Sequence, residues 1–332
     1  MPAAGKKLHH FVWRFYLRQW APGEQIFCLQ NRKITSRNLE KVGAENYFYR
    51  LNEISPEDAE FIENLIIKDS PEGLKESHRF LVRAFRLPHT AKRKLEDRIR
   101  AAKEAGQELD EKVVQESRAL IEQQIIELNE NYHNSIEDLF QPILEALQAG
   151  NLTFLQEQEK RHAFYYGLSV QYARTNHVKG TRQNMKKPAY ELYTRIANVL
   201  THIMAINVGH SWIGQHDRNQ IVILENASEI PFVTADQPAI NLSSNPTNFD
   251  PPTKFDVYYP LSPTRALLVL EQSSTHLPHS ASISGIQVHQ YNLLIAAHSY
   301  RQVYSNSPAE LEAINAELEA FLSCFRGLPN NT

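Results

Sequence analysis

The segment from His9 to Trp20 carries the densest set of chemically active side chains in the sequence. Its imidazoles could transfer protons near neutral pH, and its guanidinium groups could bind oxyanions. Because these polar heads alternate with aromatic rings, the segment is typical of a pocket wall, and equally of an N-terminal strand held against a core. The candidate residues are His9, His10, Arg14, Tyr16 and Arg18.

A second polar point lies where a β-prone run, Phe232-Val-Thr234-Ala-Asp236-Gln-Pro238, ends at a proline. The run delivers the Thr234 hydroxyl and the Asp236 carboxylate to a strand end. A carboxylate there could orient a histidine, hold a metal ion or act as a general base. It could equally form a turn with its own backbone.

Gln171 and Arg174 are the third pair of candidates, within a predicted helix from Leu155 to about Val178. Residues three apart on a helix project to neighbouring points, so the amide and the guanidinium could act on one partner. Aromatic residues of the same helix lie on or near that side.

Composition sets the broad class. The chain has 332 residues, 42% hydrophobic and 22% charged, as in ordinary globular proteins, and its net charge of -3 creates no field that would recruit nucleic acid or an acidic membrane. Cys28 and Cys324 are too few for a disulfide framework or a thiolate zinc site. We expect a cytoplasmic protein without a membrane-spanning segment.

Several familiar active-site motifs are absent from the sequence. It has no Walker loop, no G-x-S-x-G elbow, no H-E-x-x-H and no dinucleotide-binding fingerprint. Four histidines lack metal-site spacing and are expected to be solvated or in the core: His276, His279, His289 and His298. The cofactor is unknown at this point, with a divalent metal as one option.

The middle of the chain is predicted to be helical. Ser55-Pro56 and Ser70-Pro71 are helix starts, and the second helix is expected to end at Pro88. A long charged helical region then follows from Thr90 to about Leu147, interrupted at Gly106. This arm, about residues 88–150, is either a projecting hairpin that mediates oligomerisation or an amphipathic pair packed on the body.

The last third has strand character. Short β-prone runs occur at 220–224, 231–234, 255–259 and 265–270, and capping-box patterns at Ser284 and Ser307 predict two C-terminal helices. We therefore predict an α+β fold with a mostly antiparallel sheet, in which the N-terminal strand joins a C-terminal sheet and helices spanning 210–328.

Taken in order, these motifs resemble a bacterial and fungal family known as domain of unknown function 4238. The resemblance rests on the His-His-x-Val-x-Arg-Phe-Tyr-Leu-Arg signature at His9, the Gln-x-x-Arg-Thr helix at Gln171 and the Phe-x-Thr-x-Asp-x-Pro strand at Phe232. It spans nearly the whole chain and implies one family domain over residues 1–332. Trp13 replaces a usual proline, and Ala235 and Gln237 replace serine and asparagine.

The resemblance implies a role in antiviral defence, because family members are similar to proteins encoded singly in defence-associated mobile elements. The first hypothesis is an anti-phage effector that hydrolyses nucleic acid or a nucleotide through a His/Arg/Asp pocket. Its catalytic residues would be His10 and Asp236, and its substrate-binding residues His9, Arg14, Tyr16, Arg18, Gln171, Arg174 and Thr234. A phage component would be the trigger.

Two other hypotheses remain open. One is a non-catalytic ligand sensor or interaction module that uses the same pocket, and the other is a buried polar network that holds sheet to helices. We also expect His10 or Arg14 to lie within reach of Asp236, with the pKa of Asp236 lowered by the neighbouring cation.

Overall fold

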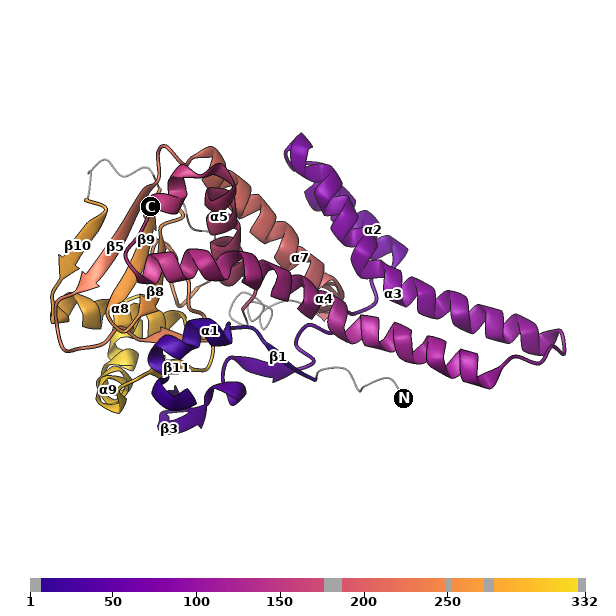
Figure 1. Ribbon diagram of the computed structural model, residues 1–332, viewed down its shortest axis with the longest axis horizontal. Coiled ribbons are helices and arrows are strands. Elements are labelled where there is room, and N and C mark those ends of the chain that lie inside the picture. Colours follow the sequence, from indigo (N-terminus) through magenta and orange to yellow (C-terminus); the bar gives the residue numbers. More distant parts are fainter. Residues whose placement is uncertain (1–6, 176–186, 249–251, 253, 272–277, 328–332) are drawn as a thin grey trace. The chain divides into compact units, whose positions relative to one another are not determined.

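The computed structural model describes residues 7–175, 187–248, 252, 254–271 and 278–327 (Figure 1). Contacts divide the chain into two compact units, each made of three segments. Unit 1 comprises Met1–His9, Glu45–Ile136 and Asn184–Asn207. Unit 2 comprises His10–Ala44, Glu137–Gln183 and Val208–Thr332. Two long helices, α4 (Glu111–Gln148) and α7 (Lys187–Gly214), each contribute to both units.

Unit 2 contains two sheets. The five-stranded sheet has the order β10-β5-β9-β8-β7, and the four-stranded sheet has the order β3-β2-β11-β6. Their strands are β2 (Gln25–Gln30), β3 (Lys33–Asn38), β5 (Gln220–Asn226), β6 (Thr234–Ala235), β7 (Ile240–Asn241), β8 (Val257–Ser262), β9 (Arg265–Leu270), β10 (Ser280–Ile283) and β11 (Val303–Ser305). The pairs are antiparallel except for β10 with β5.

Both sheets share one core with the C-terminal helices α8 (Gly285–His298) and α9 (Pro308–Ser323). β2 pairs with β11, with Leu29 opposite Val303, which confirms the prediction that an N-terminal strand joins the C-terminal sheet. The predicted strand at 231–234 is reduced to β6, because Phe232 and Val233 bond to a loop carbonyl and a side chain instead. The α+β fold is thus as predicted.

The N-terminal segment folds as β1 (Leu8–His10), α1 (Arg14–Leu17) and a 3-10 turn (Arg18–Trp20). β1 pairs with β4 (Ala44–Asn46). Trp13, Tyr16 and Trp20 are fully buried, because large apolar rings gain about 25 cal/mol for each Å² removed from water. The segment is therefore ordered and packed into the core.

Unit 1 is helical, with α2 (Pro56–Ile62), a π turn (Glu63–Ile67), α3 (Glu72–Glu104) and the first part of α4. α3 and α4 form an antiparallel hairpin (Figure 1), in which Arg118 bonds both carboxylate oxygens of Glu96. The predicted helix end at Pro88 is wrong, since α3 runs through this proline. The predicted long helix and the break at Gly106 are confirmed.

Two of the four predicted serine caps hold. Ser70 does not cap α3, which begins at Glu72 after Pro71; the Ser70 hydroxyl donates instead to the carbonyl oxygen of Ile66. Ser55 with Asp58, and Ser284 with Gln287, both form capping boxes. The box predicted at Ser307 is wrong, because the Ser307 side chain makes no cap bond. Its expected partner Glu310 instead accepts hydrogen bonds from the side chains of His289 and Asn292 on α8. Buried hydrogen bonds between α8 and α9 thus replace the expected capping bond within α9.

Asp58 makes a testable contribution to unit 1. Besides capping α2, it accepts two hydrogen bonds of 2.8 Å from Arg195 on α7, which lower its pKa below the usual value. A lowered pKa stabilises the fold above the unfolded value of about 3.9, and this stability is lost as the pH falls. We expect Asp58→Asn to cost about 1–2 kcal/mol at pH 7, discounted because Arg195 is partly exposed.

Urea unfolding from pH 7 to pH 3 measures this contribution. The difference between wild type and Asp58→Asn should shrink below about pH 4. Asp69→Asn, at an exposed position of the same unit, is the control and should change stability by less than about 0.5 kcal/mol. An equal loss at every pH would contradict the role given to the ion pair.

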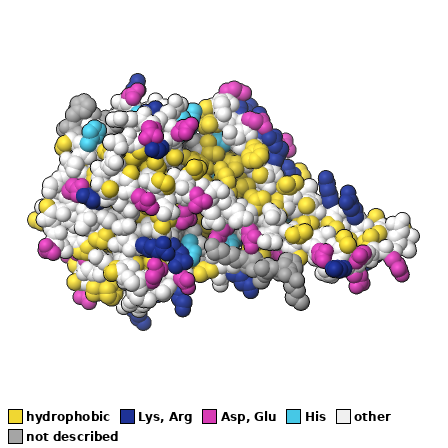
Figure 2. Space-filling model, in the orientation of Figure 1, with side chains coloured by type: hydrophobic (Ala, Val, Ile, Leu, Met, Phe, Trp, Pro, Cys, Tyr) yellow, Lys and Arg dark blue, Asp and Glu magenta, His cyan; other side chains and the backbone are white. Residues whose placement is uncertain are grey.

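No helix in the described part of the chain is both long enough and apolar enough to cross a membrane. In the face shown in Figure 2, basic and acidic side chains are interspersed. This face therefore has no extended surface of one charge, and what binds to it depends on the charges of individual side chains.

Candidate functional site

Arg174 follows the C-terminal end of α5 (Gln158–Ala173) and is buried, with 1% of its surface exposed. Its Nε donates to the carbonyl oxygen of Phe11 at 2.7 Å, and its Nη2 donates to that of His10 at 2.6 Å. The guanidinium carbon lies 4.9 Å from the centre of the Trp13 ring, in the range of a cation–π contact. Arg174 thus connects the helical motif to the N-terminal motif.

Tyr16 and Trp20 connect the N-terminal motif to the strand motif. The Tyr16 hydroxyl lies 2.6 Å from that of Thr234 and donates to the carbonyl oxygen of Pro260 at 2.8 Å. The Trp20 indole N–H donates to the carbonyl oxygen of Phe232 at 2.6 Å. Burial raises the pKa of Tyr16 well above its usual value, so this hydroxyl stays protonated. The three sequence motifs therefore meet within unit 2.

Asp236 is also buried, but its carboxylate serves the backbone. It accepts hydrogen bonds from the backbone N–H groups of Tyr300, Arg301 and Gln302 at 2.8, 2.7 and 3.0 Å. Burial raises the pKa of Asp236 to about 6, while these donors oppose the rise. The expectation of a lowered pKa is wrong, because removal from water outweighs the hydrogen bonds.

The expected pairing of Arg14 with Asp236 is absent from the described residues. Arg14 lies 3.4 Å from Glu24 and 3.9 Å from Glu40, and Arg18 bonds Glu24 at 3.1 Å. Both arginines are partly exposed. Their charges are therefore balanced by nearby glutamates and do not form a free basic patch.

The two neighbouring histidines belong to different units. In unit 1, the Nδ1 of His9 accepts a hydrogen bond from the backbone N–H of Tyr49 at 2.9 Å and lies 3.4 Å from Glu130. His10 belongs to unit 2, where its carbonyl oxygen binds Arg174. His9 is thus held by its own unit, and His10 is the histidine at the meeting point of the motifs.

We define the motif cluster as the side chains of Trp13, Tyr16, Gln171, Arg174, Thr234 and Tyr259. Tyr259 stacks on Tyr16 with ring centres 5.0 Å apart. Gln171 is 0% exposed, yet neither its amide oxygen nor its amide nitrogen has a hydrogen-bond partner among the described residues. The Tyr259 hydroxyl and the Trp13 indole N–H share this condition. Such groups cost about 1–3 kcal/mol each when left unsatisfied.

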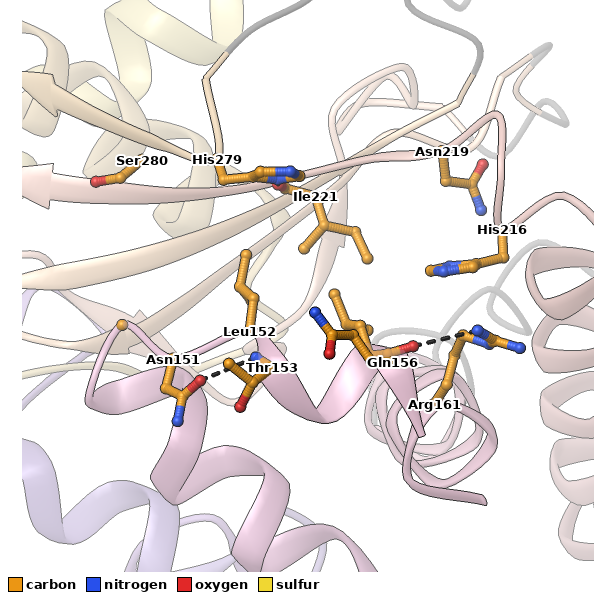
Figure 3. A pocket seen from close by; sticks show the side chains of 12 residues that line it. Asn151, Leu152, Thr153, Gln156, Arg161, His216, Asn219, Ile221, His279 and Ser280 are labelled. Carbon is orange, nitrogen blue, oxygen red and sulfur yellow. Dashed lines mark hydrogen bonds between the residues drawn. The ribbon is translucent and has the colours of Figure 1, made fainter. Parts of the chain in front are cut away.

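An open pocket of about 750 Å³ lies elsewhere in unit 2 (Figure 3). It is lined by Gly150, Asn151, Leu152, Thr153, Leu155, Gln156, Arg161, His216, Asn219, Ile221, His279 and Ser280. The sequence does not reveal this site, because its residues form no motif and come from three separate stretches of the chain, 150–161, 216–221 and 279–280. His279, expected to be solvated or in the core, lines it; His276 lies outside the described residues.

Within the described part of the chain, no three or more His, Cys, Asp or Glu side chains are grouped so that they could hold a metal ion. The oxygens of Asp236, the carboxylate considered for this role, are used by the backbone.

Comparison with protein families finds a match to most of the chain. The model of a family described as "Protein of unknown function (DUF4238)" matches residues 8–309. The match covers the N-terminal, helical and strand motifs and the whole of α8, and it ends at the start of α9. No curated protein and no solved structure matches the chain.

Proposed function

The chain belongs to the DUF4238 family of proteins of unknown function, and from this premise we propose that it is a cytoplasmic anti-phage effector that senses a nucleotide through the motif cluster. The defence role comes from the resemblance of its three motifs to proteins of defence-associated mobile elements. The ligand class comes from the geometry of the cluster.

The unpartnered amide of Gln171 carries this proposal. A glutamine amide presents a donor beside an acceptor, which matches the paired donor and acceptor on the edge of a nucleobase. The Tyr259 hydroxyl and the Trp13 indole N–H, which have no hydrogen-bond partner among the described residues either, supply further polar groups in the same cluster. A bound nucleotide would satisfy groups that are otherwise costly to bury.

Sensing is favoured over hydrolysis by the position of Asp236. A general base needs a lone pair aimed at the proton that it removes, whereas this carboxylate accepts three backbone N–H groups. Of the two residues considered catalytic, Asp236 is thus committed to the backbone of residues 300–302.

A nucleotide suits the surface better than a long nucleic acid. Binding of duplex or single strands depends on a continuous basic groove. On the face shown in Figure 2, acidic and basic side chains alternate, and Arg14 and Arg18 pair with glutamates. We further propose that a phage component triggers the protein. The α3–α4 hairpin would contact a second copy of the chain through the exposed side chains of Leu87, Val113 and Leu120.

We expect Gln171→Leu to weaken nucleotide binding at least tenfold while unfolding stability stays level or rises by about 1 kcal/mol. The ligand loses a bidentate partner worth about 1–3 kcal/mol, whereas the free protein loses only unsatisfied polar atoms. Calorimetric titration against nucleotide, RNA and DNA panels, with and without divalent metal, measures binding. Thermal unfolding measures stability.

Gln158→Leu, at an exposed position of the same helix, is the matched control and should bind as the wild type does. In cells, Gln171→Leu should lose phage protection and Gln158→Leu should keep it. Destabilisation of Gln171→Leu with unchanged binding would show a purely structural amide and overturn the proposal. Product formation by the wild type would replace sensing with hydrolysis.

A further inference from the structure

The pocket of Figure 3 combines a cationic end with an apolar middle. Arg161 comes from α5, and His216 and Asn219 come from the segment that follows α7. These three side chains lie together at one end of the pocket in Figure 3. None of the residues that line the pocket is acidic. The guanidinium therefore meets no carboxylate within the lining that the structure describes.

The polar atoms at this end are incompletely satisfied. Arg161 donates from Nη1 to the carbonyl oxygen of Leu155 at 3.2 Å, but its buried Nε has no partner among the described residues. Asn219 donates from its amide nitrogen to the carbonyl oxygen of Trp212 at 3.2 Å, and its buried amide oxygen is likewise unpartnered. A buried guanidinium N–H without an acceptor favours an incoming anion.

His216 adds a neutral imidazole. Its Nδ1 lies 2.9 Å from the hydroxyl of Tyr165. Burial, with the nearby Arg161 cation, lowers the pKa of His216 despite the opposing charge of Asp217. The imidazole is thus uncharged at neutral pH and can donate or accept one hydrogen bond.

The rest of the pocket fits the body of a small organic molecule. Leu152, Leu155 and Ile221 form the apolar middle, and His279 and Ser280 lie at the other end in Figure 3. His279 is itself oriented by the backbone, since its Nδ1 lies 3.1 Å from the carbonyl oxygen of Ile221. A volume of about 750 Å³ is within the range of ligand pockets for molecules of nucleotide size.

We propose that this pocket is a binding site for a phosphomonoester of about mononucleotide size, with the phosphate against Arg161 and His216 and the uncharged body along Leu152 and Ile221. The site is separate from the motif cluster and does not depend on the function proposed for it. The phosphate supplies acceptors for the unpartnered guanidinium N–H and for an imidazole N–H. Its retained P–OH, or a sugar hydroxyl, can donate to Asn219.

Titration calorimetry with the full-length protein tests this site, with AMP, UMP, glucose 6-phosphate and inorganic phosphate as probes and adenosine as the probe without phosphate. We expect Arg161→Gln to weaken binding of the phosphate probes by about tenfold or more, and His216→Gln to weaken it severalfold. Arg218→Gln and His210→Gln are the matched controls at exposed positions and should bind normally.

Gln171→Leu separates this site from the motif cluster: it should leave the binding of glucose 6-phosphate and inorganic phosphate unchanged, because these two probes carry no nucleobase for the motif cluster to recognise. Thermal unfolding of each variant shows whether it has folded. Absence of binding for every phosphate probe, or equal affinity in wild type and a folded Arg161→Gln, overturns the proposal. Equal affinity for adenosine and AMP overturns it as well, since the phosphate would then contribute nothing.

Discussion

Replacing Asp236 with alanine is expected to lower the free energy of unfolding by about 3–5 kcal/mol. The backbone N–H groups of Tyr300, Arg301 and Gln302 would lose their acceptor inside the protein, and each unsatisfied buried donor costs about 1–3 kcal/mol. These residues lead into β11, and the carbonyl oxygen of Gln302, just before that strand, accepts a hydrogen bond from the backbone N–H of Asp236 at 2.9 Å. Chemical unfolding at pH 7 measures the loss.

Asp236→Asn should lower the free energy of unfolding less than Asp236→Ala does, and it should remove a pH dependence of stability. It keeps one acceptor oxygen and relieves the burial of charge, but its amide nitrogen would face a backbone N–H. In the wild type the folded pKa is raised to about 6, so stability falls as the pH rises from about 4 to 6 and is constant above. Asp236→Asn should lack this slope.

Asp138→Asn, at an exposed position of α4 in the same unit, is the control and should change stability by less than about 0.5 kcal/mol. If Asp236→Ala unfolds at the same denaturant concentration as the wild type, the carboxylate does not support the segment that leads into β11. Asp236 would then be available for chemistry, and the hydrolase hypothesis would regain its second residue.

Replacing Gly167 with alanine should destabilise unit 2 by about 3 kcal/mol, although alanine is the better helix former by about 1 kcal/mol. A Cβ atom on Gly167 would lie 2.1 Å from Cδ2 of Phe140, which is fully buried. Phe140 packs on Trp13 at a ring separation of 5.1 Å. To make room for the added methyl group, α5 or α4 must shift, or the packing that supports Arg174 must change.

Gly214→Ala is the matched control, because an added Cβ at the end of α7 meets no atom within 4 Å. It should leave stability unchanged or raise it slightly. Thermal unfolding measures both variants, and tryptophan fluorescence reports the surroundings of Trp13. A wild-type melting temperature for Gly167→Ala would contradict the tight contact between the two helices.

Local signals were the most predictable from sequence. Ser55 and Ser284 were identified correctly, because a cap depends on residues only three positions apart. The pattern at Ser307 failed because Glu310 gains more from two side-chain donors in the interior than from a surface cap. The helix end predicted at Pro88 is wrong for a related reason. The packing of α3 tolerates the one backbone hydrogen bond that a proline cannot donate in a long helix.

The candidate site was only partly predictable. Aromatic density correctly placed Tyr16 and Trp20 against the C-terminal strands, because large rings must be buried. The same sequence could not show that Asp236 would bind the backbone of residues 300–302, since backbone donors carry no sequence signal. Arg161 and His216 were missed because a pocket lined by three distant stretches of the chain exists only after folding.

The pairing of Tyr16 with Pro260 also affects how the protein emerges from the ribosome. These two residues are 244 positions apart, and at about 5–20 residues per second the partner appears roughly 10–50 s after Tyr16. During that interval the aromatic N-terminal segment has no sheet to cover it, and the edge of β2 that will receive β11 is open. The nascent chain should therefore depend on chaperones until its last strand has been synthesised.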